Sequence, residues 1–307
     1  MKKTLVLFTT KNAYYFDHLN IKNVDISGVF STSTGCDNNF LKLVRKIKSP
    51  LTKKFYTEWY EEIKKYERIV VFDTAIQIDP KLLHNIAKIN PDADKFVYSW
   101  NIVKDEDYYK YIRKQADTTG FAFYCYDRGD CEKYQMKFNT IMYDKALKLE
   151  PQITDSDALF LGYLKDRKDK MITLYMALSK VGLIPKFVVV GCEDQSFRGF
   201  DYSNQYISYF NYLDMLNKSK SILDIAQDNQ DGFSMRVMEA IFYNKKLLTT
   251  NHAIRDADFY DPNNILIVDL EQTQTSDYKD FFDKPFHNYS DKMREFYSFE
   301  SWLERFV

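Results

Sequence analysis

The side chains best suited to chemistry lie in one short segment of the chain, Gln230 to Ala240, with the sequence QDGFSMRVMEA. Gly232 permits a tight turn, and Ser234 is a favourable N-cap for a helix that begins directly after it. The backbone amides of Ser234, Met235 and Arg236 would then point out of the helix start, where the helix dipole favours an anion. The segment therefore predicts a binding site that suits a diphosphate.

Arg236 and Glu239 add two opposite charges to this predicted helix. Because they are three residues apart, they share one helix face. The forked donors of a guanidinium suit a phosphate, and a carboxylate one turn away can accept both hydroxyls of a ribose. The same spacing also fits an internal ion pair on an amphipathic helix, so spacing alone leaves both interpretations open.

Short apolar runs alternate with helical patterns through the first half of the chain. We expect strands at 4–8, 24–30, 68–72, 95–100 and 120–126, and helices at 60–66, 80–89 and 108–115. This alternation is typical of a parallel sheet that is covered by helices on both faces.

The alternation restarts after about residue 150. We expect strands at 158–162, 186–191, 205–210, 221–226, 246–250 and 264–269, and helices at 168–181, 234–243 and 300–307. A chain of 307 residues exceeds what one hydrophobic core usually holds, so we predict two Rossmann-like α/β domains, 1–150 and 151–307. Two facing domains of this kind usually hold their ligand in the cleft between them, at the carboxyl ends of the strands.

The composition argues against several classes of protein. The net charge is −1, so no strong field attracts nucleic acid. The nine glycines form neither a GxGxxG nor a Walker motif, which disfavours dehydrogenases and P-loop enzymes. The four cysteines include no CxxC pair and the four histidines are scattered, which disfavours a zinc site. Without a signal peptide or an apolar run of membrane-spanning length, the chain is expected in the cytoplasm.

Three stretches carry a resemblance to a known group of enzymes. The segment Asp231 to Glu239, of the form DGFS-x4-E, resembles the acidic-Gly-Phe-Gly-x4-Glu element of GT-B glycosyltransferases. The longer stretch Ile222 to Ile265 is similar to bacterial GT-B transferases that assemble capsule, exopolysaccharide and lipopolysaccharide chains, and Phe160 to Arg167 resembles their first donor-domain loop. The first half matches only in layout. Asp stands here at the first acidic position and Ser at the second glycine, which leaves retention or inversion of the sugar open.

This resemblance implies a fold and an activity. The fold is α/β of the GT-B type, with an acceptor-binding N-terminal domain, a nucleotide-sugar-binding C-terminal domain and a terminal helix that packs back toward the first domain. The activity is transfer of a sugar, from a uridine diphosphate donor above all, to a hydroxyl of a glycan acceptor in bacterial surface polysaccharide synthesis. The alternatives are a polyol-phosphate transferase of similar fold, which usually relies on histidines, and a partner subunit without turnover.

The resemblance also implies the residues of the donor site. The loop after the first strand of the second domain approaches the diphosphate from one side, the helix start holds it from the other, and Glu239 takes the ribose. Asp224 and Gln227 are expected to meet the base or the sugar, and Asn251 to line the same cleft. The expected donor-binding set is Gly162, Lys165, Arg167, Asp224, Gln227, Asp231, Ser234, Met235, Arg236, Glu239 and Asn251. For the loop of Lys165 and Arg167, a solvated basic surface is the alternative.

A reaction with inversion needs a base for the acceptor hydroxyl. Asp73 and Asp127 each follow a predicted strand of the first half and are the two candidates. The alternative for both is a capping role at the next helix or turn. Arg236 is expected to act in catalysis by stabilising the charge of the leaving diphosphate.

No metal cofactor is expected. Four Asp-x-Asp tripeptides occur, but they lie in polar loops or before strands rather than at the end of a buried strand: Asp92–Asp94, Asp105–Asp107, Asp155–Asp157 and Asp256–Asp258. Basic side chains at the diphosphate would supply the charge that a metal supplies elsewhere.

The segment Phe40 to Phe55 is basic and amphipathic, with six Lys and Arg residues among apolar ones. Such a segment can lie on an anionic membrane surface, which would suit an acceptor carried on a lipid. A solvated basic helix face is the alternative. The sequence does not predict an oligomeric state.

Overall fold

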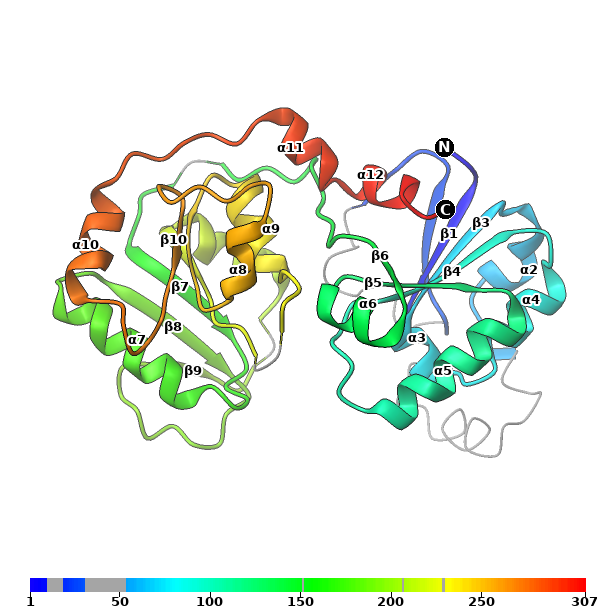
Figure 1. The fold of residues 1–307 in the computed structure, drawn as a ribbon, viewed down its shortest axis with the longest axis horizontal. Helices are drawn as coiled ribbons and strands as arrows, with labels where there is room; N and C mark the ends of the chain where they lie inside the picture. Colours follow the sequence, from blue (N-terminus) through cyan, green and yellow to red (C-terminus); the bar gives the residue numbers. More distant parts are fainter. Residues whose placement is uncertain (10–18, 31–53, 151, 206, 228–229) are drawn as a thin grey trace. The chain divides into compact units, whose positions relative to one another are not determined.

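The computed structural model describes residues 1–9, 19–30, 54–150, 152–205, 207–227 and 230–307. It divides into two compact units, which are described separately below (Figure 1). Unit 1 comprises Met1–Thr140 and Trp302–Val307, and unit 2 comprises Ile141–Ser301. Of the basic segment Phe40 to Phe55 only the last two residues are described, so its membrane interpretation lies outside the described residues.

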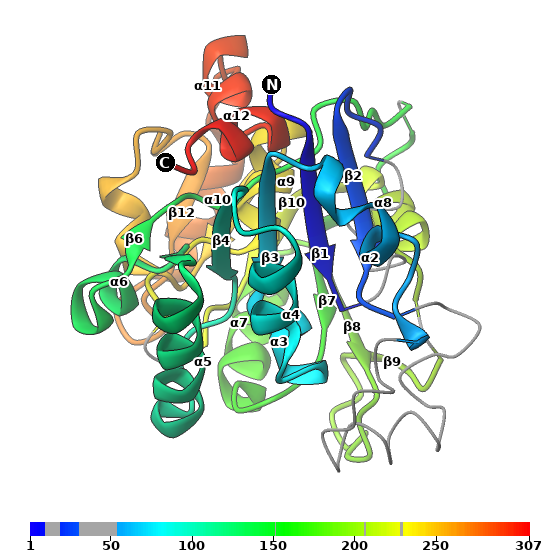
Figure 2. The same cartoon turned by 90° about the vertical axis from the view of Figure 1, so that its right-hand side faces the viewer.

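Unit 1 contains a six-stranded parallel sheet in the order β2-β1-β3-β4-β5-β6. Its strands are β1 (Thr4–Phe8), β2 (Val24–Gly28), β3 (Arg68–Phe72), β4 (Asp94–Ser99), β5 (Ala122–Cys125) and β6 (Lys137–Phe138). Its helices are α2 (Trp59–Glu62), the 3-10 turn η2 (Ile63–Lys65), α3 (Asp73–Ile78), α4 (Leu82–Ile89), α5 (Glu106–Thr119) and α6 (Arg128–Tyr134). Figure 2 shows α3, α4 and α5 over the face of this sheet that is turned to the viewer.

The central strands β1 and β3 are buried at every position, as apolar runs in a parallel sheet covered on both faces should be. The end of the chain completes this unit. Helix α12 (Phe299–Glu304) places Trp302 against Phe72 and Tyr98, with ring centroids 5.9 and 4.9 Å apart. Arg68 Nη1 also donates to the carbonyl of Leu303 at 2.7 Å. The predicted packing of the terminal helix on the N-terminal domain is confirmed.

Unit 2 contains a second six-stranded parallel sheet, in the order β12-β11-β10-β7-β8-β9. Its strands are β7 (Ser156–Gly162), β8 (Pro185–Val190), β9 (Asp201–Ser203), β10 (Ser219–Asp224), β11 (Lys246–Thr249) and β12 (Ile265–Ile267). Its helices are α7 (Lys168–Lys180), α8 (Tyr209–Asn217), α9 (Met235–Phe242), the 3-10 turn η3 (His252–Asp256), α10 (Thr275–Asp283) and α11 (Asp291–Phe296). One core lies under α7 and α10, while α8 and α9 pack at β10 on the other side (Figure 1).

Two sequence predictions differ from the structure. The strand expected at 205–210 is wrong, because Tyr209 begins α8; Ser208 caps this helix by accepting from the Asn211 amide, and the helix buries Tyr212 and Leu216. The division between the units falls after Thr140 rather than near residue 150, and the last six residues belong to unit 1.

Each sheet has a point where the chain reverses its direction of strand addition. In unit 1 this point lies between β1 and β3, and in unit 2 between β7 and β10. Ligands of open parallel sheets bind at the carboxyl ends of the strands beside such a point. The ends of β3 and β7 are therefore the places to look for function.

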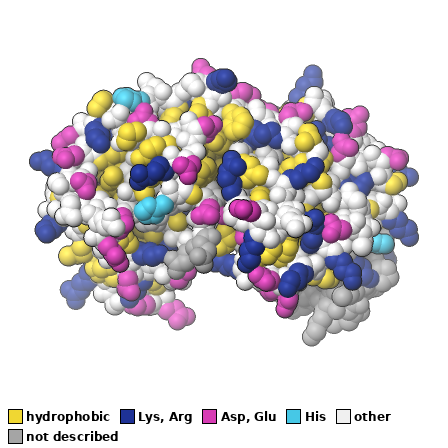
Figure 3. All heavy atoms as spheres, viewed as in Figure 1, with side chains coloured by type: hydrophobic (Ala, Val, Ile, Leu, Met, Phe, Trp, Pro, Cys, Tyr) yellow, Lys and Arg dark blue, Asp and Glu magenta, His cyan; other side chains and the backbone are white. Residues whose placement is uncertain are grey.

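Within the described residues, no helix is long and apolar enough to span a bilayer. On the face of the molecule shown in Figure 3, acidic and basic side chains are interspersed, as the net charge of −1 leads one to expect.

Candidate functional site

Two arginines meet at the reversal point of unit 2. Arg167 precedes the first turn of α7, and Arg236 lies in the first turn of α9. Their guanidinium carbons lie 5.2 and 5.0 Å from the centroid of the Phe160 ring, which is fully buried in β7. One aromatic ring therefore holds two cations side by side, each in a cation–π contact.

Arg167 is buried, with 6% of its surface exposed. Its Nη atoms donate to the carbonyls of Ile225 and Tyr163, the latter at 3.0 Å, and its Nε has no hydrogen-bond partner among the described residues. Burial and the neighbouring charge of Arg236 lower the pKa of Arg167 to about 10, although Asp224 partly offsets them. The guanidinium thus stays charged at neutral pH in surroundings that favour an anion beside it.

Arg236 is held from two sides. Its Nη2 donates to the Leu161 carbonyl at 2.6 Å, and its Nη1 lies 4.0 Å from Oδ1 of Asp224. The buried Asp224 carboxylate also accepts from Ser234 Oγ at 2.7 Å and from Thr249 Oγ1 at 3.1 Å. Asp224 therefore orients the start of α9 and acts on both cations.

A side chain at position 162 would crowd Arg236. A Cβ on Gly162 would lie 2.8 Å from Nη2 of Arg236, well inside van der Waals contact. The absence of a side chain lets Arg236 reach the backbone at the end of β7. The sequence had placed Gly162 in the donor loop, and the structure supplies this physical reason for a glycine.

The loop before α9 is fixed by two polar side chains. Ser234 is the N-cap, as predicted, and its Oγ accepts the Arg236 amide at 3.2 Å. The expectation that this amide is available to a ligand is therefore wrong, since the cap already uses it. Asn251 donates to the carbonyls of Asp231 and Gly232 at 3.2 and 3.3 Å, so it shapes this loop.

Four other predicted donor residues lie in the segments next to Arg167, Asp224 and Arg236. Lys165 is exposed, in a left-handed backbone conformation with φ of 48°. Asp231 is exposed in the loop before α9, Gln227 is half-buried after β10, and Met235 is half-buried at the first position of α9.

Glu239 is the predicted donor residue whose surroundings are most distinctive. Only 1% of its surface is exposed, and its two carboxylate oxygens accept hydrogen bonds from Tyr209 (2.9 Å) and Tyr212. Burial raises its pKa to about 7, although the two phenols and the charge of Arg236 act in the opposite direction. The carboxylate thus lies near Arg236 but is enclosed by tyrosines.

The two candidate bases of unit 1 differ in their surroundings. Asp127 is the N-cap of α6, and its Oδ1 accepts the Asp130 amide at 2.9 Å. Asp73 begins α3 directly after β3, and its Oδ1 has no hydrogen-bond partner among the described residues. Burial raises the pKa of Asp73 to about 6, although hydrogen bonds from Thr74, Asn101, Trp100 and Ser99 partly offset it.

Sequence reasoning missed Phe160 as the ring that the arginines share, and it missed both tyrosines at Glu239. The signal for the tyrosines was present, because Tyr209, Tyr212 and Leu216 recur at helical spacing after a capping Ser208. Phe160 reads from sequence only as one apolar residue of a buried strand.

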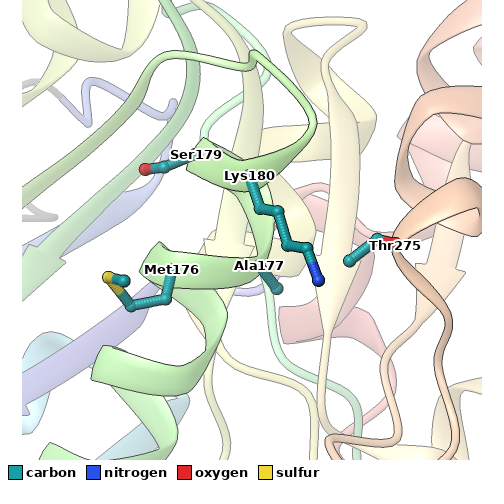
Figure 4. Close-up of a pocket in the computed structure, with 5 residues that line it drawn as sticks. All are labelled: Met176, Ala177, Ser179, Lys180 and Thr275. Carbon is teal, nitrogen blue, oxygen red and sulfur yellow. The ribbon is translucent and has the colours of Figure 1, made fainter.

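Among the described residues, there is no group of three or more His, Cys, Asp or Glu side chains that could hold a metal ion. A shallow hollow of about 530 Å³ lies between α7 and the start of α10, where Lys180 extends toward Thr275 (Figure 4). Its lining includes none of the predicted site residues.

The chain is similar in architecture to solved structures of glycosyltransferases. No protein-family model and no curated protein matches the chain. It is similar to the lipopolysaccharide outer core galactosyltransferase WaaB (12% identity, TM-score 0.52), covering 100% of this chain and 98% of that one. It is also similar to Alr3699/HepE of Anabaena, solved with UDP and glucose (9% identity, TM-score 0.55), covering 100% and 92%. With its two six-stranded parallel sheets, the chain has the GT-B fold that the sequence predicted.

Proposed function

We propose that this chain transfers a sugar from a nucleoside-diphosphate donor, a uridine diphosphate sugar above all, to a hydroxyl of a glycan acceptor in bacterial surface polysaccharide synthesis. The observation that carries the proposal is the pair Arg167 and Arg236, which share the Phe160 ring at the reversal point of the unit 2 sheet. That is where parallel sheets bind nucleotides, and paired guanidinium groups suit a diphosphate.

The arginine pair can perform the donor half of the reaction. When the bond to the sugar breaks, negative charge develops on the leaving diphosphate, and fixed cations stabilise it. A phosphate oxygen would also give the buried Nε of Arg167 the partner that the described residues do not provide. Because two guanidinium groups supply the charge, we expect transfer to continue undiminished in the presence of EDTA.

Asp73 is the base that the surroundings favour. It follows β3, at the reversal point of the unit 1 sheet, and a pKa of about 6 leaves it ionised at neutral pH but still basic. Thr74 Oγ1 and Tyr108 Oη are, like Asp73 Oδ1, buried without a hydrogen-bond partner among the described residues. These three atoms can form hydrogen bonds with hydroxyl groups of an acceptor, whereas the carboxylate would repel an anionic acceptor. We therefore propose a neutral, hydroxyl-bearing acceptor at unit 1.

The first test is thermal stabilisation by UDP, GDP, CDP and TDP. We expect one of them to raise the melting temperature of the wild type, and Arg236→Ala to abolish the shift. Lys220→Ala is the matched control, because it removes an exposed cation at the opposite end of β10, where Lys220 pairs with Asp157 at 2.7 Å. Absence of a shift with all four nucleotides would contradict the proposal. Release of nucleoside monophosphate during turnover would instead indicate a polyol-phosphate transferase.

A further inference from the structure

Glu239 lies in a set of hydrogen bonds inside unit 2. Tyr209 and Tyr212 lie one turn apart at the start of α8, with their rings stacked at 5.8 Å, and each donates to a different oxygen of Glu239. All three side chains are buried. A buried carboxylate is costly unless it is hydrogen-bonded, so the two phenols are what makes this position tolerable without a ligand.

Two more tyrosines, Tyr143 and Tyr243, extend this set of hydrogen bonds beyond Tyr209. The Tyr143 hydroxyl is within hydrogen-bond distance of the Tyr209 hydroxyl and lies 2.9 Å from the Tyr243 hydroxyl. Tyr143 therefore lies one hydrogen bond further from Glu239 than Tyr209 does. This difference supplies a control, because Tyr143→Phe removes a hydroxyl from the same set without removing a donor to the carboxylate.

Access, rather than bonding capacity, decides whether Glu239 can receive a ligand here. A carboxylate has about four lone-pair positions, so two phenols leave room for two more donors. With only 1% of the residue exposed, however, a ribose cannot approach while both phenols stay in place. A ribose presents two neighbouring hydroxyls, the same number and kind of donor as the two phenols. An exchange would therefore replace each hydrogen bond with a similar one.

We propose that Tyr209 and Tyr212 occupy the positions at Glu239 that the 2′ and 3′ hydroxyls of the donor ribose take, so that the first turn of α8 must yield when a nucleotide binds. This inference rests on the proposed function. The two tyrosines are positioning residues, which hold Glu239 in the free protein and compete with the ligand. A nucleotide without both hydroxyls leaves the two phenols in place, because it cannot replace the bonds that it would displace.

The test is calorimetric titration with the nucleoside diphosphate that stabilises the wild type best and with its 2′,3′-dideoxy analogue. Removal of one phenol costs Glu239 a hydrogen bond in the free protein. It costs nothing in the bound protein, where a ribose hydroxyl has replaced that phenol. We therefore expect Tyr212→Phe to tighten binding of the ribonucleotide by about fivefold and to leave the dideoxy analogue unchanged. Tyr209→Phe should act in the same direction, and Tyr143→Phe should change neither affinity.

A second measurement needs no variant. Amide hydrogen exchange in residues 209–217 of the wild type should accelerate when the ribonucleotide binds and not when the dideoxy analogue binds. No acceleration with the ribonucleotide, or Tyr212→Phe changing both affinities alike, would overturn the inference and assign the phenols a purely structural role. If the wild type binds no nucleotide at all, the proposed function itself fails, which is a distinguishable result.

Discussion

At the reversal point of the unit 2 sheet, two guanidinium groups flank one buried phenyl ring. At the corresponding point of unit 1, one oxygen of the buried Asp73 carboxylate has no hydrogen-bond partner among the described residues. Both sheets have six parallel strands, and both points lie at strand ends that the fold makes available to ligands. The backbones are alike, so the difference lies in the few side chains that follow the strands. In unit 2 those side chains favour an anion, and in unit 1 they favour a donor of hydrogen bonds.

In the proposed reaction the two units perform different half-reactions. An anion would leave at the cations of unit 2, and a proton would be accepted at the carboxylate of unit 1. Changes in one unit should therefore leave the ligand of the other unit bound.

The largest effect is expected from Asp73→Asn. The amide keeps the size of the side chain but cannot accept a proton, so the rate of sugar transfer should fall by about 10²–10⁴-fold. Affinity for the nucleoside diphosphate, measured by titration, should stay unchanged because that ligand binds unit 2. A variant that retains transfer would remove Asp73 from the reaction.

The second-largest effect on the rate of sugar transfer is expected from Arg236→Lys. Lysine keeps the charge but loses the fork that spans Leu161 O and Asp224, so the transition state should lose charge stabilisation worth about 10²–10³-fold in rate. We expect this loss in steady-state kinetics with saturating donor. Lys220→Ala, which removes a cation from the other end of β10, should leave the rate within twofold.

The pH dependence of kcat/KM sharpens the assignment to unit 1. In the proposed reaction Asp73 acts as the ionised base, and burial raises its pKa from the ordinary 3.8 to about 6. The protonated fraction therefore grows as the pH falls through 6, and activity should fall about tenfold for each pH unit below that value. Above pH 6 this group should impose no further change. A profile that stays level down to pH 4.5 would contradict the raised pKa.

Gly162→Ala should have a smaller effect, confined to unit 2. The added Cβ would lie 2.8 Å from Nη2 of Arg236, so the guanidinium must shift. We expect a loss of about tenfold in kcat/KM. If the loss arises through Arg236, it should disappear in the background of Arg236→Ala, because mutations of residues in contact are not additive. An equal loss in both backgrounds would locate the effect elsewhere.

Sequence patterns gave most of the architecture but only part of the site. Apolar runs such as those of β1, β3 and β7 predict buried parallel strands, and the capping Ser234 predicts the start of α9. Contacts between elements far apart in the chain leave no such local signal. Arg236 meets the Phe160 ring from 76 residues away, and Tyr209 and Tyr212 enclose Glu239 from 30 and 27 residues away. Both arrangements depend on tertiary packing.

The smallest effect is expected from the other aspartate of unit 1. Asp127→Ala removes the N-cap of α6, where the carboxylate accepts the Asp130 amide at 2.9 Å, and should lower the free energy of unfolding by about 1 kcal/mol. Asp127→Asn should recover most of this stability, because asparagine also caps helices well. Both variants should transfer sugar at nearly the wild-type rate. If Asp127→Asn instead lost activity while keeping its stability, the proton would be accepted at α6 rather than at the end of β3.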